Sequence, residues 1–181
     1  IFAKHGHKII AVSDSKNAIV NSEGLDIEAL LKYKADNKKL DGFPGSKTIT
    51  NAELLVLECD VLIPAALENQ ITTENAEEIK SKMVFELANG PVTPDADEVL
   101  FARGIPVVPD ILANSGGVTV STFEWEQNLK NEHWGEEEVF QKLKKILDEE
   151  SKIIFDKSNE LKTDLRRSAF IVALERIEKA M

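Results

Sequence analysis

Polar residues stand directly after short apolar runs, at places where a chain can bind another molecule. Asp14 follows the run at 8–12, and Asn89 ends the run at 83–89. A carboxylate such as Asp14 can accept both hydroxyls of an adenosine ribose, and it can equally cap its own turn. An amide such as Asn89 can donate to and accept from a ribose hydroxyl or a carboxamide, or it can bond locally and complete a turn.

Small side chains and glycines mark further candidate positions. Ala65 and Ala66 would let a flat ligand approach the backbone closely, although small residues also occur wherever a helix packs tightly on a sheet. The tetrad Asn-Ser-Gly-Gly at 114–117 suits an anion or an amide, but it is also an ordinary helix start. Ser121 lies one turn further on and can face the same pocket as Val118; alone it would be a surface serine or bond back to its own helix.

Other reactive groups support no catalytic or metal site. His5 and His7 flank a glycine and have no further ligands nearby, so a solvated turn is the better interpretation. Cys59 is the only cysteine, which excludes an internal disulfide and a cysteine-rich metal site and fits a cytoplasmic location. No Ser/His/Asp order and no Cys/His pair supports nucleophilic catalysis.

The composition is that of one sizeable globular domain. The 181 residues are 43% hydrophobic and 30% charged, which argues against disorder. The formal net charge of -10 gives no general attraction for nucleic acid or for an anionic membrane. No apolar run approaches the ~18 residues of a membrane helix. From the charge and the lack of such a run, we expect neither a nucleic acid nor a membrane as a partner.

The elements that must position these residues alternate between short buried strands and helices. This alternation predicts an α/β fold with a doubly wound parallel sheet and helices on both of its faces. Ligands of such sheets bind at the carboxyl ends of the strands, where the candidate residues lie. We expect strands at 8–12, 59–66, 83–89 and 105–109, and helices after Asp26 and at 50–57, 73–81 and 94–103.

From Ser115 onward the predicted strands stop. Helices are expected at about 117–131, 136–161 and 164–180, and the last has an apolar face that should pack. We therefore divide a single domain, 1–181, into a sheet region at 1–114 and a helical region at 115–181. The first residue is Ile1 rather than Met, so we expect the chain to begin inside a longer product.

Four stretches resemble, in matching order, the nucleotide-binding domain of the glutamate, leucine, phenylalanine and valine dehydrogenase family, and above all its glutamate branch. They are distributed over most of the chain, from residue 11 to residue 128, and the last is long and specific. The resemblance implies a partial NAD(P)-binding domain whose Rossmann-like sheet lacks its first strand and glycine-rich turn. The stretches are AVSDSKNAIVNSEGLDI (11–27), CDVLIPAALENQIT (59–72), ELANGPVTPDAD (86–97) and VPDILANSGGVTVSTFEWEQN (108–128).

The resemblance also implies how a cofactor, NAD or NADP, would be bound. Asp14 would contact the adenosine ribose, and Ala65 and Ala66 would line the path of the cofactor. Asn89 and Asn114 would bind its nicotinamide half. The choice between the two cofactors stays open, because a lysine two residues after the aspartate can neutralise a 2′-phosphate.

Val118 and Ser121 would contact the amino-acid substrate, the serine through the distal carboxylate of glutamate. The implied reaction is the reversible oxidative deamination of L-glutamate to 2-oxoglutarate and ammonia. The family's catalytic lysine and aspartate belong to a separate N-terminal domain, so we expect 1–181 alone to be inactive and the full-length protein to be a hexamer. Two alternatives stay open: a leucine, phenylalanine or valine dehydrogenase, and a non-catalytic module of the same fold.

Overall fold

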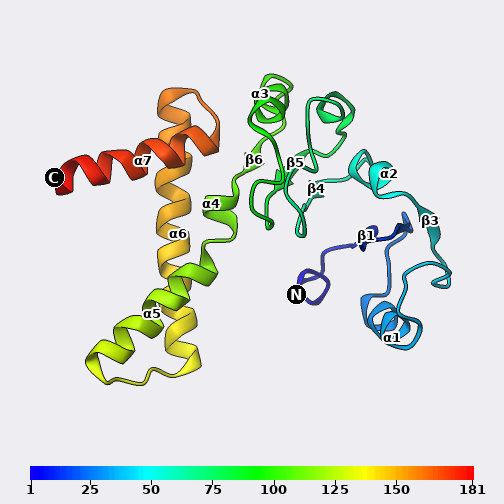
Figure 1. The fold of residues 1–181 in the computed structure, drawn as a ribbon, viewed down its shortest axis with the longest axis horizontal. Helices are drawn as coiled ribbons and strands as arrows, with labels where there is room; N and C mark the ends of the chain where they lie inside the picture. The colour runs from blue at the N-terminus through cyan, green and yellow to red at the C-terminus, as the bar shows by residue number, and fades with distance from the viewer. The chain divides into compact units, whose positions relative to one another are not determined.

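The first part of the chain forms a three-stranded antiparallel sheet, β1-β2-β3 (Figure 1). The strands are β1 (Ala11–Ser13), β2 (Ala18–Val20) and β3 (Lys47–Ile49). The computed structural model describes all 181 residues, and Ile1–Glu58 make up the first of its two compact units. We expected a parallel strand at 8–12. The strand here begins later and pairs antiparallel with β2, because the turn that follows β1 reverses the chain within four residues.

The two α-helices of the first unit begin at side chains that cap them. A 3₁₀ turn, η1 (Phe2–His5), precedes β1. The Asp26 side chain accepts from the N–H of Ala29 and starts α1 (Ile27–Asn37), as predicted. Thr50 and Glu53 form the predicted capping box at the start of α2 (Asn51–Leu55). The core of this unit is made of Ile19, Leu25, Leu30, Leu40 and Phe43.

The second unit, Cys59–Met181, contains the parallel sheet that the sequence predicted. Its strands β4 (Val61–Leu62), β5 (Met83–Phe85) and β6 (Val107–Val108) are adjacent in the order β4-β5-β6. The pairing is parallel on both sides of β5. The helix α3 (Pro94–Ala102) joins β5 to β6. The Thr93 side chain caps its start by accepting from the N–H of Ala96. The α/β fold class is thus confirmed.

The helix expected at 73–81 is not formed, and this prediction was wrong. Only a 3₁₀ turn, η2 (Ala76–Glu78), lies there. The guanidinium of Arg103 donates to the carbonyl of Ala76, which would accept from the N–H of Lys80 in a helix, and to the carbonyl of Ile79. The Asn75 side chain ties the same segment back to the residues before it. Side-chain bonds therefore replace helical ones here.

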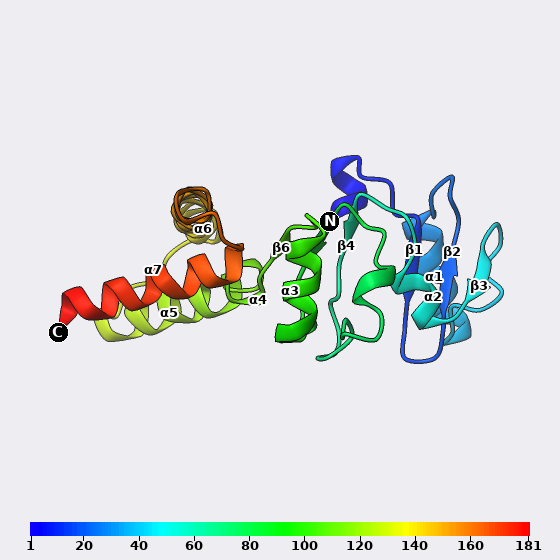
Figure 2. The ribbon, with the colours of Figure 1, turned by 90° about the horizontal axis from the view of Figure 1, so that it is seen from above.

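The chain beyond β6 is helical, in agreement with the three predicted helices. A short helix, α4 (Asp110–Ala113), leads into α5 (Gly116–Lys130), which is followed by α6 (Glu136–Leu161) and α7 (Leu165–Ala180). In Figure 1, α5 lies along the first half of α6, and α7 crosses its second half. Figure 2, which looks along α6, shows α7 passing beside it. None of these helices is long and apolar enough to span a membrane.

Candidate functional site

The loops after β4 and β5 meet at the carboxyl edge of the parallel sheet. The N–H groups of Leu87 and Ala88 both donate to the carbonyl of Pro64, at 3.0 and 2.9 Å. These two hydrogen bonds hold the loop at 64–66 against the loop at 88–90. Pro64 is buried beneath the edge, whereas Ala65 and Ala66 beside it are exposed. The two alanines therefore present small side chains on an open surface, as a cofactor path requires.

Asn89 and Asn114 meet at this edge. The amide nitrogen of Asn114 donates to the amide oxygen of Asn89 at 2.7 Å, and to the carbonyl of Leu87 at 3.4 Å. The amide nitrogen of Asn89 and the amide oxygen of Asn114 have no hydrogen-bond partner within the chain. One free donor and one free acceptor, side by side, match the two groups of a carboxamide. The pair therefore fits the amide of a nicotinamide ring.

Gly90 and Asp110 fix the loop that carries Asn89. Gly90 has a φ of 56°, a left-handed conformation that suits glycine. Its N–H donates to Oδ2 of Asp110 at 2.8 Å. Asp110 is the first residue of α4, the short helix that ends just before Asn114. One carboxylate thus connects the two segments that hold the paired asparagines.

The start of α5 presents the two residues predicted to contact a substrate. Val118 is 67% exposed, and Ser121, one turn further along the helix, is also exposed. The hydroxyls of Thr119 and Thr122 donate to backbone carbonyls one turn earlier, at 2.9 and 3.0 Å. The Ser121 hydroxyl makes no hydrogen bond within the chain. It is therefore free to bind another molecule, unlike its helical neighbours.

Asp14 lies in the first unit, directly after β1, and its carboxylate has local partners. Oδ1 accepts from the N–H groups of Lys16 and Asn17 at 2.9 and 3.3 Å, and Oδ2 is paired with Lys34. The Lys34 side chain and these N–H groups lower the pKa of Asp14 below its ordinary value. Asp14 therefore caps its own turn, which was one of the two interpretations of this residue. The contact with an adenosine ribose stays a prediction.

Sequence reasoning missed a buried ionic cluster beneath the edge. Arg166 of α7 is bonded to Glu86, Asp97 and Asp110, which come from three different elements. Glu86 is fully buried, and a carboxylate directly after an apolar strand was the one local signal in the sequence. Nothing near Arg166 in the sequence distinguishes it from its neighbour Arg167, because its partners are up to 80 residues away.

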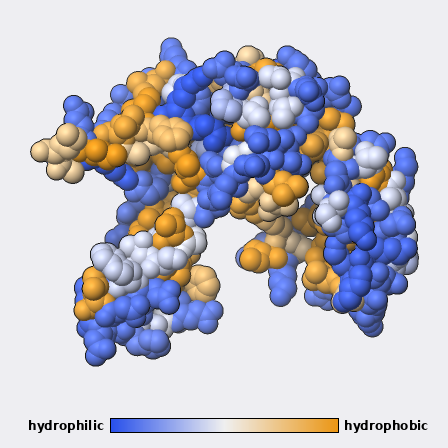
Figure 3. Space-filling view, in the orientation of Figure 1, coloured by the Kyte–Doolittle hydropathy of each residue, from blue (hydrophilic) through white to orange (hydrophobic).

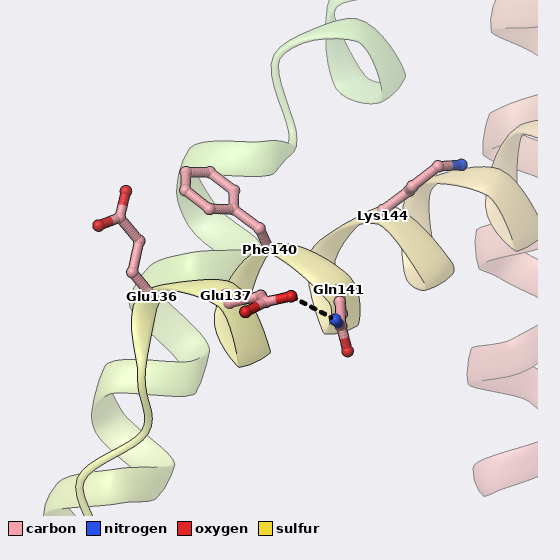
Figure 4. Close-up of a pocket in the computed structure, with 5 residues that line it drawn as sticks. All are labelled: Glu136, Glu137, Phe140, Gln141 and Lys144. Carbon is pink, nitrogen blue, oxygen red and sulfur yellow. Dashed lines mark hydrogen bonds between the residues drawn. The ribbon is translucent and has the colours of Figure 1, made fainter.

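A surface pocket lies elsewhere, at the start of α6 (Figure 4). Its lining residues all belong to this helix; they are Glu136, Glu137, Phe140, Gln141 and Lys144. The amide of Gln141 donates to Glu137 at 3.3 Å. None of the candidate residues lines this pocket, so it is not part of the site. The structure contains no cluster of side chains that could hold a metal ion.

Known proteins resemble the chain over its whole length. It is 47% identical to a glutamate dehydrogenase of Thermotoga maritima over 97% of the chain, and 45% identical, over the same share, to an NADP-specific glutamate dehydrogenase of Synechocystis sp.. These matches cover 42% and 43% of the two relatives, so the chain spans about two-fifths of their length. The structure superimposes on a hetero-hexameric glutamate dehydrogenase of Thermus thermophilus with a TM-score of 0.89 at 29% identity, over 99% of the chain and 42% of that protein.

The family model for glutamate, leucine, phenylalanine and valine dehydrogenases matches residues 1–181 without a gap at either end. The resemblance seen in the four sequence stretches is thereby confirmed, and the chain belongs to the glutamate/leucine/phenylalanine/valine dehydrogenase family.

Proposed function

We propose that residues 1–181 supply the cofactor-binding part of an NAD(P)-dependent glutamate dehydrogenase, which interconverts L-glutamate with 2-oxoglutarate and ammonia. The observation that carries this proposal is the Asn89–Asn114 pair, which keeps one donor and one acceptor unbonded at the carboxyl edge of the parallel sheet. The names of two relatives that are 45% and 47% identical to the chain support glutamate as the substrate.

The nicotinamide group, when bound, accepts or returns a hydride; the residues of this chain hold and orient it. Asn89 and Asn114 would bond the carboxamide and so fix the orientation of the ring. Ala65 and Ala66 would leave room along the path of the cofactor. In the first unit, Asp14 would accept from the adenosine ribose.

Substrate choice would depend on the start of α5. The unbonded hydroxyl of Ser121 can donate to the distal carboxylate of glutamate, and Val118 can contact its apolar stem. Leucine, phenylalanine and valine have an apolar group in that position, and a hydroxyl facing it would gain nothing. This difference separates the proposal from the sister activities of the family.

The cofactor preference, NAD or NADP, is not fixed by these residues. The Synechocystis relative is named as NADP-specific, which supports a 2′-phosphate in that protein. The Lys34 ammonium is paired with the Asp14 carboxylate, and Lys16 follows two residues after Asp14, so a positive charge near this turn could offset such a phosphate. The cytoplasmic location stays a prediction.

We also propose that the full-length protein assembles as a hexamer. The Thermus neighbour is a hetero-hexamer, and the chain has uncovered apolar side chains that an assembly would bury. Hydrophobic surface is seen over α5 and α7 in Figure 3. The exposed large residues on these helices include Trp125, Leu129, Phe170, Leu174 and Ile177.

The test compares two purified proteins, residues 1–181 alone and the full-length protein that contains them. The full-length protein should reduce NAD or NADP with L-glutamate, and residues 1–181 alone should not, because the resemblance places the catalytic lysine and aspartate in another domain. Turnover by residues 1–181 above a blank, or a full-length protein that prefers leucine to glutamate, would contradict the proposal.

A further inference from the structure

Arg166 bonds three carboxylates from three separate elements. Its Nη2 donates to Oε1 of Glu86 at 2.7 Å, its Nε to Oδ2 of Asp97 at 2.8 Å, and its Nη1 to Oδ1 of Asp110 at 3.1 Å. Glu86 follows β5, Asp97 lies in α3, and Asp110 begins α4. The planar guanidinium can reach all three at once, which the single ammonium of a lysine does less well.

The cluster is buried and has more negative than positive groups. Glu86 is fully buried and Asp97 is 7% exposed. Burial raises the pKa of both carboxyl groups, and the Arg166 guanidinium opposes that rise. The pKa of Arg166 itself is raised by Glu86 and Asp97, so the arginine stays charged. Arg166 is therefore the cation that forms ion pairs with all three carboxylates, and Arg167 acts only on Asp97, through its charge and without an ion pair.

The cluster continues as hydrogen bonds to the two segments that carry the paired asparagines. The second oxygen of Glu86 accepts from the N–H of Asp110 at 2.7 Å, and the second oxygen of Asp110 accepts from the N–H of Gly90 at 2.8 Å. Gly90 directly follows Asn89, and α4 directly precedes Asn114. A chain of hydrogen bonds thus runs from α7 to Gly90, next to Asn89, and to the start of α4, which precedes Asn114.

We propose that Arg166 is a positioning residue for the nicotinamide end of the cofactor: through Asp110 and Glu86 it sets the relative placement of Asn89 and Asn114. This inference rests on the proposed function of the two asparagines. Arg166 itself touches no bound group. Its effect is to hold Asp110 so that one carboxylate oxygen faces the arginine and the other faces the N–H of Gly90.

The neighbouring Arg167 provides a matched control. It lies on the same helix turn and pairs with Glu98 and with Asp164, but its side chain is 51% exposed and its contacts do not reach the edge. The pair with Glu98 is exposed on both sides, and such pairs contribute little. Arg167→Met therefore removes an arginine and two ion pairs from α7 and leaves every hydrogen bond of Glu86, Asp110 and the asparagines in place; its charge reaches the cluster only at Asp97.

The test uses the full-length protein and measures binding, not turnover. Dissociation constants are measured for the reduced dinucleotide that the parent binds more tightly, NADH or NADPH, and for its nicotinamide-free counterpart, ADP-ribose or 2′-phospho-ADP-ribose. The variants are Arg166→Met, Asp110→Ala and the control Arg167→Met. Hydrogen exchange of the peptide that contains Gly90 is followed without ligand, because protection of that N–H reports the Asp110 bond directly.

Arg166→Met should weaken binding of the reduced dinucleotide about tenfold and leave the nicotinamide-free ligand within about twofold, as expected for loss of charge-assisted bonds that orient one end of the ligand. Asp110→Ala should have the same selective effect and should raise the exchange rate of the Gly90 peptide. It also removes one carboxylate from a cluster with excess negative charge, so it should fold even where Arg166→Met does not. Arg167→Met should change neither constant.

Equal weakening of both ligands, or an unchanged exchange rate in Asp110→Ala, would show that the cluster only stabilises the fold and would overturn the inference. A parent protein that binds the nicotinamide-free ligand as tightly as the reduced dinucleotide would instead refute the proposed role of the asparagines, and the inference with it. The dissociation constants of the two ligands for the parent protein therefore distinguish a failure of the proposed function from a failure of this inference.

Discussion

The side-chain amides of Asn89 and Asn114 meet at 2.7 Å although 25 residues separate them in the chain. Each keeps one polar group unbonded, a donor on Asn89 and an acceptor on Asn114. Two amides that needed only each other could form both possible bonds. The pair instead leaves one donor and one acceptor without a partner, which is the feature that connects the fold to a nicotinamide carboxamide.

Replacing either asparagine should weaken cofactor binding. Asn89→Ala and Asn114→Ala should each raise the dissociation constant of the reduced dinucleotide about fivefold, since a neutral hydrogen bond contributes ~1 kcal/mol. The double variant should lose less than the product of the two effects, because the residues share a bond. Titration calorimetry measures this, with Asn159→Ala, an exposed asparagine of α6, as the control. Unchanged affinity in both single variants would refute the assignment.

Gly90→Ala should affect both stability and binding. The left-handed backbone at φ 56° costs a non-glycine residue about 1 kcal/mol, and an added Cβ would meet no other atom within 4 Å, so the cost is conformational. Gly104, with a φ of 73° and equally open surroundings, provides the control. Both alanine variants should lose similar unfolding free energy in denaturant titrations, and only Gly90→Ala should weaken dinucleotide binding. Equal weakening by Gly104→Ala would contradict this.

The Lys34–Asp14 pair predicts a pH dependence of stability. The pKa of folded Asp14 is lowered, chiefly by Lys34, so its stabilising contribution is present above the ordinary aspartate pKa and is lost as the pH falls through the folded value. Lys34→Met should therefore destabilise the protein at pH 7, and the difference from the parent should shrink below about pH 4. Chemical unfolding at a series of pH values tests this, with exposed Lys32→Met as the control. A difference that persists unchanged at pH 2 would exclude the pair as its cause.

Ser121→Ala should change substrate choice. Loss of a hydrogen bond to the distal carboxylate of glutamate should lower kcat/KM for glutamate about tenfold to a hundredfold, because bonds to charged groups contribute ~1.5–3 kcal/mol. The low rate with leucine should be preserved. Thr122→Val, which removes a hydroxyl already bonded to the helix backbone, is the control. Parallel losses for both amino acids would favour a role in folding rather than in selection.

Local signals allowed much of the fold to be predicted. Asp26, and Thr50 with Glu53, marked helix starts that the structure confirms, because capping depends on neighbours within one turn. The strands β2 and β3 were missed because the strand predictions were based on an alternation of strands with helices, whereas β1, β2 and β3 pair antiparallel with one another. The helix expected at 73–81 is not formed, because the side chain of Arg103, far along the chain, bonds the carbonyls of Ala76 and Ile79 and holds the segment in another conformation.

The candidate site was only partly visible in the sequence. The position of Asn89 and Asn114 after predicted strands was enough to select them, but not to show that they bond each other. Arg166 could not have been found, since its partner Glu86 is 80 residues away and no local pattern encodes such a pairing. Residues that act through long-range contacts require the structure.

The most direct test of the central claim is a crystal structure of the full-length protein with its reduced dinucleotide and 2-oxoglutarate. We predict the nicotinamide carboxamide at about 3 Å from the amide nitrogen of Asn89 and from the amide oxygen of Asn114, with the bonds of Arg166 unchanged. A nicotinamide ring bound away from the carboxyl edge of β4, β5 and β6, with both asparagines bonded only to each other, would contradict the account.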